Sequence, residues 1–120
     1  MLFRSSPTQI PPVFLPKVTL DSGSHNFGAG GSYTFTVTNT GNSATGPLTI
    51  SISGANAGQF TVGPPNTCTG GVSLGPGESC TVTVTFTPAV GTGARSATLT
   101  ITGSAGGSAS ASLDGTDPPP

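Results

Sequence analysis

A strict alternation of apolar residues with Thr or Ser, repeated in five separate stretches, constrains the fold more than any other feature. The stretches are 33–38, 48–52, 80–86, 98–102 and 108–113. Side chains of a β-strand point alternately to the two faces of a sheet, so each stretch has one apolar face and one hydroxyl face. We therefore predict that each stretch is a half-buried β-strand.

Turn residues separate strand-length segments from residue 18 to the end of the chain, and helical spacing occurs only in a turn near 55–59. Seven to nine short antiparallel strands pack most economically as a two-layer β-sandwich. The segment 103–112 contains only Gly, Ala and Ser, and its small side chains favour an edge strand.

The predicted core consists of the apolar residues that share the inward phase of these strands. They are Val18, Leu20, Phe27, Tyr33, Phe35, Val37, Leu48, Ile50, Ile52, Phe60, Val62, Leu74, Val82, Val84, Phe86, Leu99, Ile101 and Leu113.

The sequence divides into an N-terminal arm at 1–17, a sandwich at 18–116 and a Pro tail at 117–120. Prolines favour an extended backbone in the arm and leave no apolar stretch of the length that a secretory signal needs. The arm nevertheless carries apolar residues that are unusual in a solvated segment: Phe3, Ile10, Val13, Phe14 and Leu15. Two interpretations stay open. The arm either anchors the chain on another subunit, or residues 13–20 are the first strand of the domain and the rest is a loose leader.

Charged residues are scarce, since three Lys or Arg and four Asp or Glu make up 6% of the chain and the formal net charge is −1. Soluble domains average about 25% charged residues. A chain without a basic patch is a poor candidate for binding nucleic acid or anionic membranes. No apolar run reaches the ~20 residues that cross a bilayer, so we expect no membrane insertion.

Cys68 and Cys80 are the only cysteines. Cys80 shares the inward phase of Val82, and Cys68 lies across a Gly-rich turn, so a disulfide that closes the loop at 70–77 is the natural interpretation. Two buried free thiols are the alternative for a protein that folds in a reducing compartment. The spacing does not fit a zinc site, and no metal or other cofactor is expected.

Catalysis is not predicted, because the sole histidine, His25, has no recognisable nucleophile motif to act on. Asp21, Asp114 and Asp117 could share a calcium ion, but aspartates at turns and strand ends are far more common. The Thr rows raise the idea of carbohydrate or ice binding. Sugar sites usually add exposed aromatic rings, and here Tyr33 and the Phe residues are mostly in the inward phase.

Several short motifs follow one another in a characteristic order: Asn26-Phe27-Gly28, YTFTVTNTGN at 33–42, LGPGESC at 74–80, VTFTP at 84–88 and LDG at 113–115. Over residues 18–116 they resemble the ASH/hydin-like immunoglobulin domains, whose bacterial form is the choice-of-anchor D domain. The resemblance implies an immunoglobulin-like (Ig-like) antiparallel β-sandwich that serves as a repeated spacer or interaction module and has no catalytic residues.

The leading functional prediction is a non-enzymatic structural subunit of a virion, either a bacteriophage capsid decoration protein or a fibre-type protein. It would sit on the virion surface in many copies, docked on capsid or other assembly subunits through Phe3, Ile10, Val13, Phe14 and Leu15. The alternative is an adhesion or spacer module of a secreted bacterial surface protein, located outside the cell. A small enzyme or a sugar-binding protein is the third hypothesis.

Overall fold

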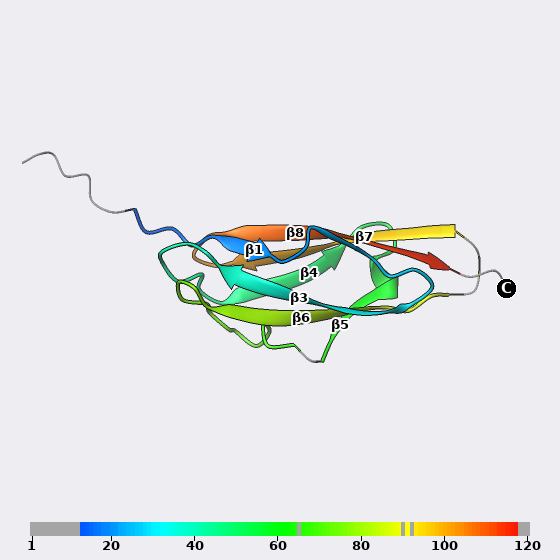
Figure 1. The fold of residues 1–120 in the computed structure, drawn as a ribbon, viewed down its shortest axis with the longest axis horizontal. Helices are drawn as coiled ribbons and strands as arrows, with labels where there is room; N and C mark the ends of the chain where they lie inside the picture. Colours follow the sequence, from blue (N-terminus) through cyan, green and yellow to red (C-terminus); the bar gives the residue numbers. More distant parts are fainter. Residues whose placement is uncertain (1–12, 65, 90, 92, 118–120) are drawn as a thin grey trace, which may run out of the picture.

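The computed structural model describes residues 13–64, 66–89, 91 and 93–117. Within these residues, eight strands form two four-stranded sheets packed as a sandwich (Figure 1), which confirms the predicted all-β class. The strands are β1 (Val18–Leu20), β2 (Ser24–Asn26), β3 (Gly31–Asn39), β4 (Leu48–Ser53), β5 (Phe60–Gly63), β6 (Ser79–Phe86), β7 (Gly93–Gly103) and β8 (Ser108–Asp117). One sheet has the order β1-β3-β6-β5, and the other has the order β2-β8-β7-β4.

The predicted helical turn is present as a short 3-10 helix, η1, at Ala57–Gln59 between β4 and β5. No helix among the described residues is long and apolar enough to cross a membrane.

One strand pair departs from the predicted antiparallel arrangement, because β2 pairs with β8 in parallel. The cause is a change of sheet at Asp21. Its N–H donates to the Thr36 carbonyl at 3.1 Å, and its carboxylate accepts the Thr36 N–H at 2.9 Å, which closes the β1–β3 ladder. After Asp21 the chain crosses to the other sheet and forms β2 beside β8.

The prediction of an edge strand within 103–112 is wrong for β8, which lies between β2 and β7 and continues to Asp117, one residue past the predicted sandwich boundary. The small side chains have a different physical role here. A Cβ placed on Gly115 would lie 2.5 Å from the ring of Phe86 on the opposite sheet. Small residues in β8 therefore let the two sheets approach closely.

The predicted core is confirmed, since every one of its members is either buried or packed against the core. The half-buried members are Leu20, Tyr33, Ile50, Ile52 and Val62. Four of these five are on the edge strands β1, β4 and β5, where solvent reaches one side. Cys68, Cys80, Ala97 and Ala111 complete the buried apolar set.

Candidate functional site

The N-terminal segment that precedes β1 is tied to the loop after β3. Asn42 makes three of the hydrogen bonds: its Oδ1 accepts from the Leu15 N–H at 2.8 Å, its Nδ2 donates to the Val13 carbonyl at 2.7 Å, and its backbone N–H donates to the Leu15 carbonyl at 3.1 Å. The Thr40 N–H also donates to the Lys17 carbonyl at 2.8 Å. The segment 13–17 therefore continues the pairing of β1 with β3 beyond the end of the regular strand.

The side chains of this tied segment are exposed to solvent. Val13, Phe14 and Leu15 are 61%, 64% and 63% exposed, and they are the exposed large hydrophobic residues of the described part of the chain. Pro16, Lys17, Thr40, Gly41 and Asn42 line an open groove together with Val13 and Leu15. Three of the five predicted arm residues thus form one exposed apolar run, while Phe3 and Ile10 lie outside the described residues.

A second asparagine, Asn39, is fully buried at the end of β3 and satisfies all of its hydrogen-bonding capacity. Its Oδ1 accepts from the N–H groups of Lys17 at 3.1 Å and Gly41 at 2.9 Å. Its Nδ2 donates to the carbonyls of Ser43 at 2.7 Å and Leu74 at 2.9 Å. One side chain therefore joins the N-terminal segment, the loop after β3 and the loop before β6.

The loop before β6 is also held covalently, since Cys68 and Cys80 form a disulfide with a Cα–Cα distance of 5.2 Å. Both cysteines are buried in the core, together with Leu74 from the loop between them. The structure therefore contains the bridge that the sequence left open against two free thiols.

His25 lies on the edge strand β2 and contacts aromatic rings. Its ring stacks on Tyr33 at a centroid distance of 4.0 Å and meets Phe27 edge-on at 4.5 Å. The Tyr33 hydroxyl donates to the Asp21 carboxylate at 3.4 Å. Partial burial raises the pKa of Tyr33, and the negative charge of Asp21 raises it further. His25 thus serves as a packing residue in this arrangement.

The three aspartates considered for calcium are not brought together. Asp21 closes the β1–β3 ladder, whereas Asp114 and Asp117 are three residues apart on β8 and point to opposite faces. Within residues 13–64, 66–89, 91 and 93–117, no group of three acidic, His or Cys side chains could hold a metal ion.

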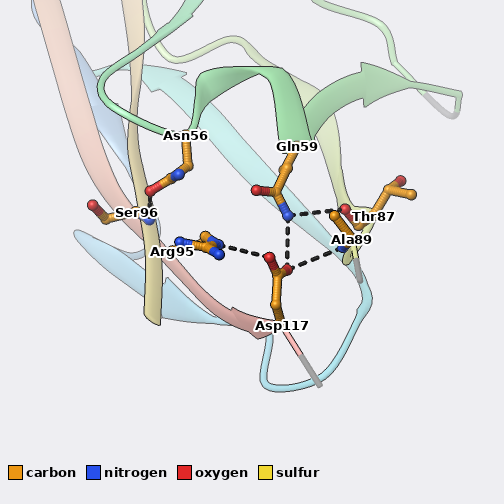
Figure 2. A network of polar contacts seen from close by, with 7 residues as sticks. All are labelled: Asn56, Gln59, Thr87, Ala89, Arg95, Ser96 and Asp117. Atoms are coloured by element: carbon orange, nitrogen blue, oxygen red, sulfur yellow. Dashed lines mark hydrogen bonds and ion pairs between the residues drawn. The ribbon is translucent and has the colours of Figure 1, made fainter. Parts of the chain in front are cut away.

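Asp117 is instead the centre of a polar cluster at the end of the sandwich (Figure 2). One carboxylate oxygen accepts from Arg95 Nε at 2.6 Å, and the other accepts from Gln59 Nε2 at 2.8 Å and the Ala89 N–H at 3.1 Å. The carboxylate is buried, with 1% of its side chain exposed. The hydrogen bond from Arg95 is the main cause of the lowered pKa of Asp117, and the bonds from Ala89 and Gln59 lower it further, against the opposing effect of burial.

Next to this cluster, Asn56 extends the pairing between β4 and β7 past the end of β4. Its Oδ1 accepts from the Ser96 N–H at 3.0 Å, and its backbone N–H donates to the Ser96 carbonyl at 3.1 Å. Gln59 Nε2 also reaches the Thr87 carbonyl at 3.4 Å (Figure 2). The polar residues around η1 therefore fix the crossing from one sheet to the other, which is a structural task.

Both outer faces of the sandwich carry hydroxyl residues that are aligned across neighbouring strands. On the β3–β6 face, hydroxyls pair with each other across strands: Ser32 with Thr85 at 2.8 Å, and Thr34 with Thr83 at 2.9 Å. Such pairs stabilise the sheet. The β4–β7–β8 face aligns hydroxyls in rows, for example Ser51, Thr100 and Ser110. The sugar-binding hypothesis stays a prediction.

The structural parts of Asn39, Asn42 and Asp117 were not predicted from the sequence. For Asn39 and Asp117, the alternation of apolar and hydroxyl residues along the strands contained a signal. Asn39 continues the inward phase of Phe35 and Val37, and Asp117 continues that of Leu113. A polar residue in an inward phase must find partners when it is buried, so both positions could have been identified as hydrogen-bonding centres.

Known proteins can now be compared with this geometry. The family model for the HYDIN/CFA65/VesB-like, Ig-like domain matches residues 13–116. A search of curated protein sequences finds no significant relative.

Solved structures with a similar fold include two proteases of Vibrio cholerae and a chaperone of Escherichia coli. VesB protease is 22% identical with a TM-score of 0.54, and the match covers 83% of this chain and 32% of VesB. The secreted serine protease VesC is 20% identical with a TM-score of 0.60, and the match covers 84% of this chain and 23% of VesC. The chaperone DraB is 14% identical with a TM-score of 0.58 over 88% of this chain and 56% of DraB.

At these identities the likeness concerns the fold. The match spans about a third or less of each protease and little more than half of the chaperone. The family match covers nearly all described residues, including the tied N-terminal segment from Val13 onward. The chain belongs to the family of HYDIN/CFA65/VesB-like, Ig-like domains.

Proposed function

We propose that this chain is a non-catalytic Ig-like interaction module that attaches to a protein partner through its N-terminal segment. The observation that carries the proposal is the run of Val13, Phe14 and Leu15, exposed side by side on a backbone that Asn42 holds in place. Exposed apolar residues usually occur singly on a soluble protein, and a contiguous run marks an interaction site.

The way these residues are held supports a binding role. An apolar segment that is ordered before it meets its partner loses less conformational entropy on binding. Asn42 ties both Val13 and Leu15 through their backbone groups, so their side chains stay available for a partner. Because Asn42 bonds only to backbone groups, the side chains at positions 13–15 can be substituted without losing these hydrogen bonds.

The chemistry of the other candidate sites supports a role without catalysis. His25 is packed between aromatic rings, and the carboxylate of Asp117 is saturated by Arg95, Gln59 and Ala89. The family model describes an Ig-like domain, and the matches to VesB and VesC leave most of each protease outside the alignment. These features of His25 and Asp117, together with the family match, also argue against the hypothesis that the chain is a small enzyme.

For the setting, we favour a spacer or interaction module of an extracellular protein over a virion subunit. The Cys68–Cys80 disulfide suits an oxidising compartment, and VesC is described as a secreted protease. VesB, VesC and DraB are described as proteases and a chaperone, so the capsid decoration hypothesis draws no support from them. Within the family, the choice-of-anchor D form remains our prediction from the sequence motifs.

The attachment can be tested in the source organism with a tagged chain and a variant that carries Val13→Ser, Phe14→Ser and Leu15→Ser. We expect the unmodified chain to sediment as part of a larger assembly and the variant to sediment alone. Thr61→Ser and Thr116→Ser, which change exposed residues of β5 and β8 outside the groove at the N-terminal segment, provide a control. Unchanged sedimentation of the triple variant would refute attachment through this segment.

A further inference from the structure

Beyond Leu48, whose outer side is covered by the loop at 72–73, strand β4 is an edge strand without the usual protection against pairing with another chain. Natural sheets blunt their edges with short strands, charged residues, prolines or covering loops. The edge strands β1 and β2 have three residues each, and β5 has four and is followed by Pro64. β4 has six residues, Leu48-Thr-Ile-Ser-Ile-Ser53, and contains neither a charge nor a proline.

The free backbone groups of this edge can be located from its neighbours. The Leu48 N–H points away from β7, because it donates to the Val72 carbonyl at 2.8 Å. Successive residues of an antiparallel strand direct their N–H and C=O groups to opposite sides, so Ile50 and Ile52 also point away from β7. Among the described residues, the outward backbone groups of Ile50 and Ile52 have no hydrogen-bond partner. Four backbone groups on two residues are therefore open.

We propose that β4 pairs with β4 of a second copy of this chain, antiparallel and about a two-fold axis through Ser51. In this register Ile50 faces Ile52 of the second copy, and Ile52 faces Ile50. All four open groups of each copy are then used, in four hydrogen bonds between the copies, and the two four-stranded sheets join into one sheet of eight strands. A symmetric pairing of this kind is the usual form of a dimer interface.

The side chains fit the same register. Ile50 and Ile52 are half-buried on the inner face, so their pairing covers apolar surface that solvent now reaches. Thr49 meets Ser53 of the second copy on the outer face, and the two Ser51 residues face each other there. No like charges oppose each other along the strand, and the whole chain has a net charge of only −1.

The surroundings limit the length of the ladder and favour this register. At one end of the strand, the Leu48 N–H already donates to the Val72 carbonyl. At the other end, Gly54, with φ of +116°, turns the chain out of the strand direction. A register centred on Ile50 would place Ile52 against Leu48 and compete with Val72. The symmetric arrangement about Ser51 alone uses both open residues of both copies, which is why we assign a second copy rather than an unrelated extended peptide.

The interface is short, and the surface area that it buries should be below the ~1,200 Å² of a standard stable interface. We therefore expect a weak dimer that forms only at high protein concentration. Sedimentation equilibrium of the full chain from about 10 μM to about 1 mM should show a monomer–dimer equilibrium.

Ser51→Lys places two ammonium groups opposite each other and should abolish the dimer. Ser110→Lys adds the same charge on the same outer face, in β8, and should leave the dimer unchanged. An equimolar mixture of Ser51→Lys and Ser51→Glu should restore association.

Cross-linking gives a second, independent readout. The two Ser51 residues form a non-hydrogen-bonded pair in this register, with Cα atoms close enough for a disulfide, so Ser51→Cys should form a covalent dimer about tenfold faster than Ser110→Cys. Native Cys68–Cys80 is common to both variants and does not affect the comparison. A chain that stays monomeric throughout the concentration range, a Ser51→Lys variant that still dimerises, or equal cross-linking of the two Cys variants would each overturn the proposal.

Discussion

Arg95 Nε donates to Asp117 Oδ2 at 2.6 Å, and this contact joins the two ends of the long β7–β8 hairpin. The Arg95 side chain is 29% exposed, whereas that of Asp117 is 1% exposed. The guanidinium therefore stays partly in solvent while the carboxylate, held also by Gln59 and Ala89, lies inside the protein. Polar contacts that hold this end of the sandwich thus depend on the ionised form of one carboxylate.

The pH dependence of stability follows from this contact. The pKa of Asp117 is lowered in the folded protein, so the ionised carboxylate stabilises the fold above the unfolded-state pKa, near 3.9, and this contribution is lost as pH falls through the folded-state pKa. We expect Asp117→Asn to unfold more easily than the unmodified chain at pH 7 and the difference to shrink below about pH 4. Urea unfolding of both proteins at pH 7, 5 and 3 checks this, and a difference that stays constant with pH would contradict it.

Gly115 provides a test of the close approach of the two sheets. A Cβ on Gly115 would lie 2.5 Å from Phe86, so Gly115→Ala should destabilise the fold by about 1–3 kcal/mol through overpacking. Gly23 is a matched control, because a Cβ there has nothing within 4 Å, and Gly23→Ala should change the free energy of unfolding by less than about 0.5 kcal/mol.

Chemical denaturation of the two glycine variants gives the measurement. Phe86→Leu should destabilise the unmodified chain but cost less in the Gly115→Ala background, because the smaller side chain makes room for the added methyl group. Additive effects of the two substitutions would mean that Gly115 and Phe86 do not interact as the structure indicates.

Asn39 is predicted to be the most sensitive polar residue of the fold. Asn39→Ala leaves the Leu74 carbonyl and the Gly41 and Lys17 N–H groups without their partner, which should cost about 3 kcal/mol. Asn42→Ala removes a similar amide from an exposed site where water can replace it, so its cost should be about 1 kcal/mol or less. Equal losses in the two variants, measured by urea unfolding, would contradict this role of Asn39.

The alternation of apolar and hydroxyl residues was enough to predict the sandwich and its core, because a period of two determines which side chains face inward. It did not predict the parallel pairing of β2 with β8, since the sheet change at Asp21 depends on one carboxylate that replaces a backbone group. Small residues in β8 indicated an edge strand, yet they permit close packing of a central strand beside Phe86. Neither outcome follows from local sequence, because both depend on residues far away in the chain.

The candidate site was predictable to a similar extent. The apolar character of Val13, Phe14 and Leu15 was visible in the sequence, but their attachment to Asn42 required the three-dimensional arrangement of two segments 27 residues apart. The polar centres at Asn39 and Asp117 occupy inward positions of strands whose other inward residues are apolar. Both could have been found by treating every polar residue in the inward phase of a strand as a candidate hydrogen-bonding centre.

The disulfide is expected to be a major source of stability for the loop before β6. Cys68 and Cys80 close a loop between positions 12 residues apart, and a bridge over a loop of this length contributes about 3 kcal/mol, mainly by restricting the unfolded chain. Cys68→Ala combined with Cys80→Ala should therefore lower the free energy of unfolding by about 3 kcal/mol, and a reducing agent should have a similar effect on the unmodified chain. Reducing agent should leave the double variant unchanged, which separates the effect of the bridge from other effects of the reagent. If the double variant unfolds at the same urea concentration as the oxidised chain, the bridge is dispensable and hydrogen bonds such as those of Asn39 and Thr45 with Leu74 hold this loop without it.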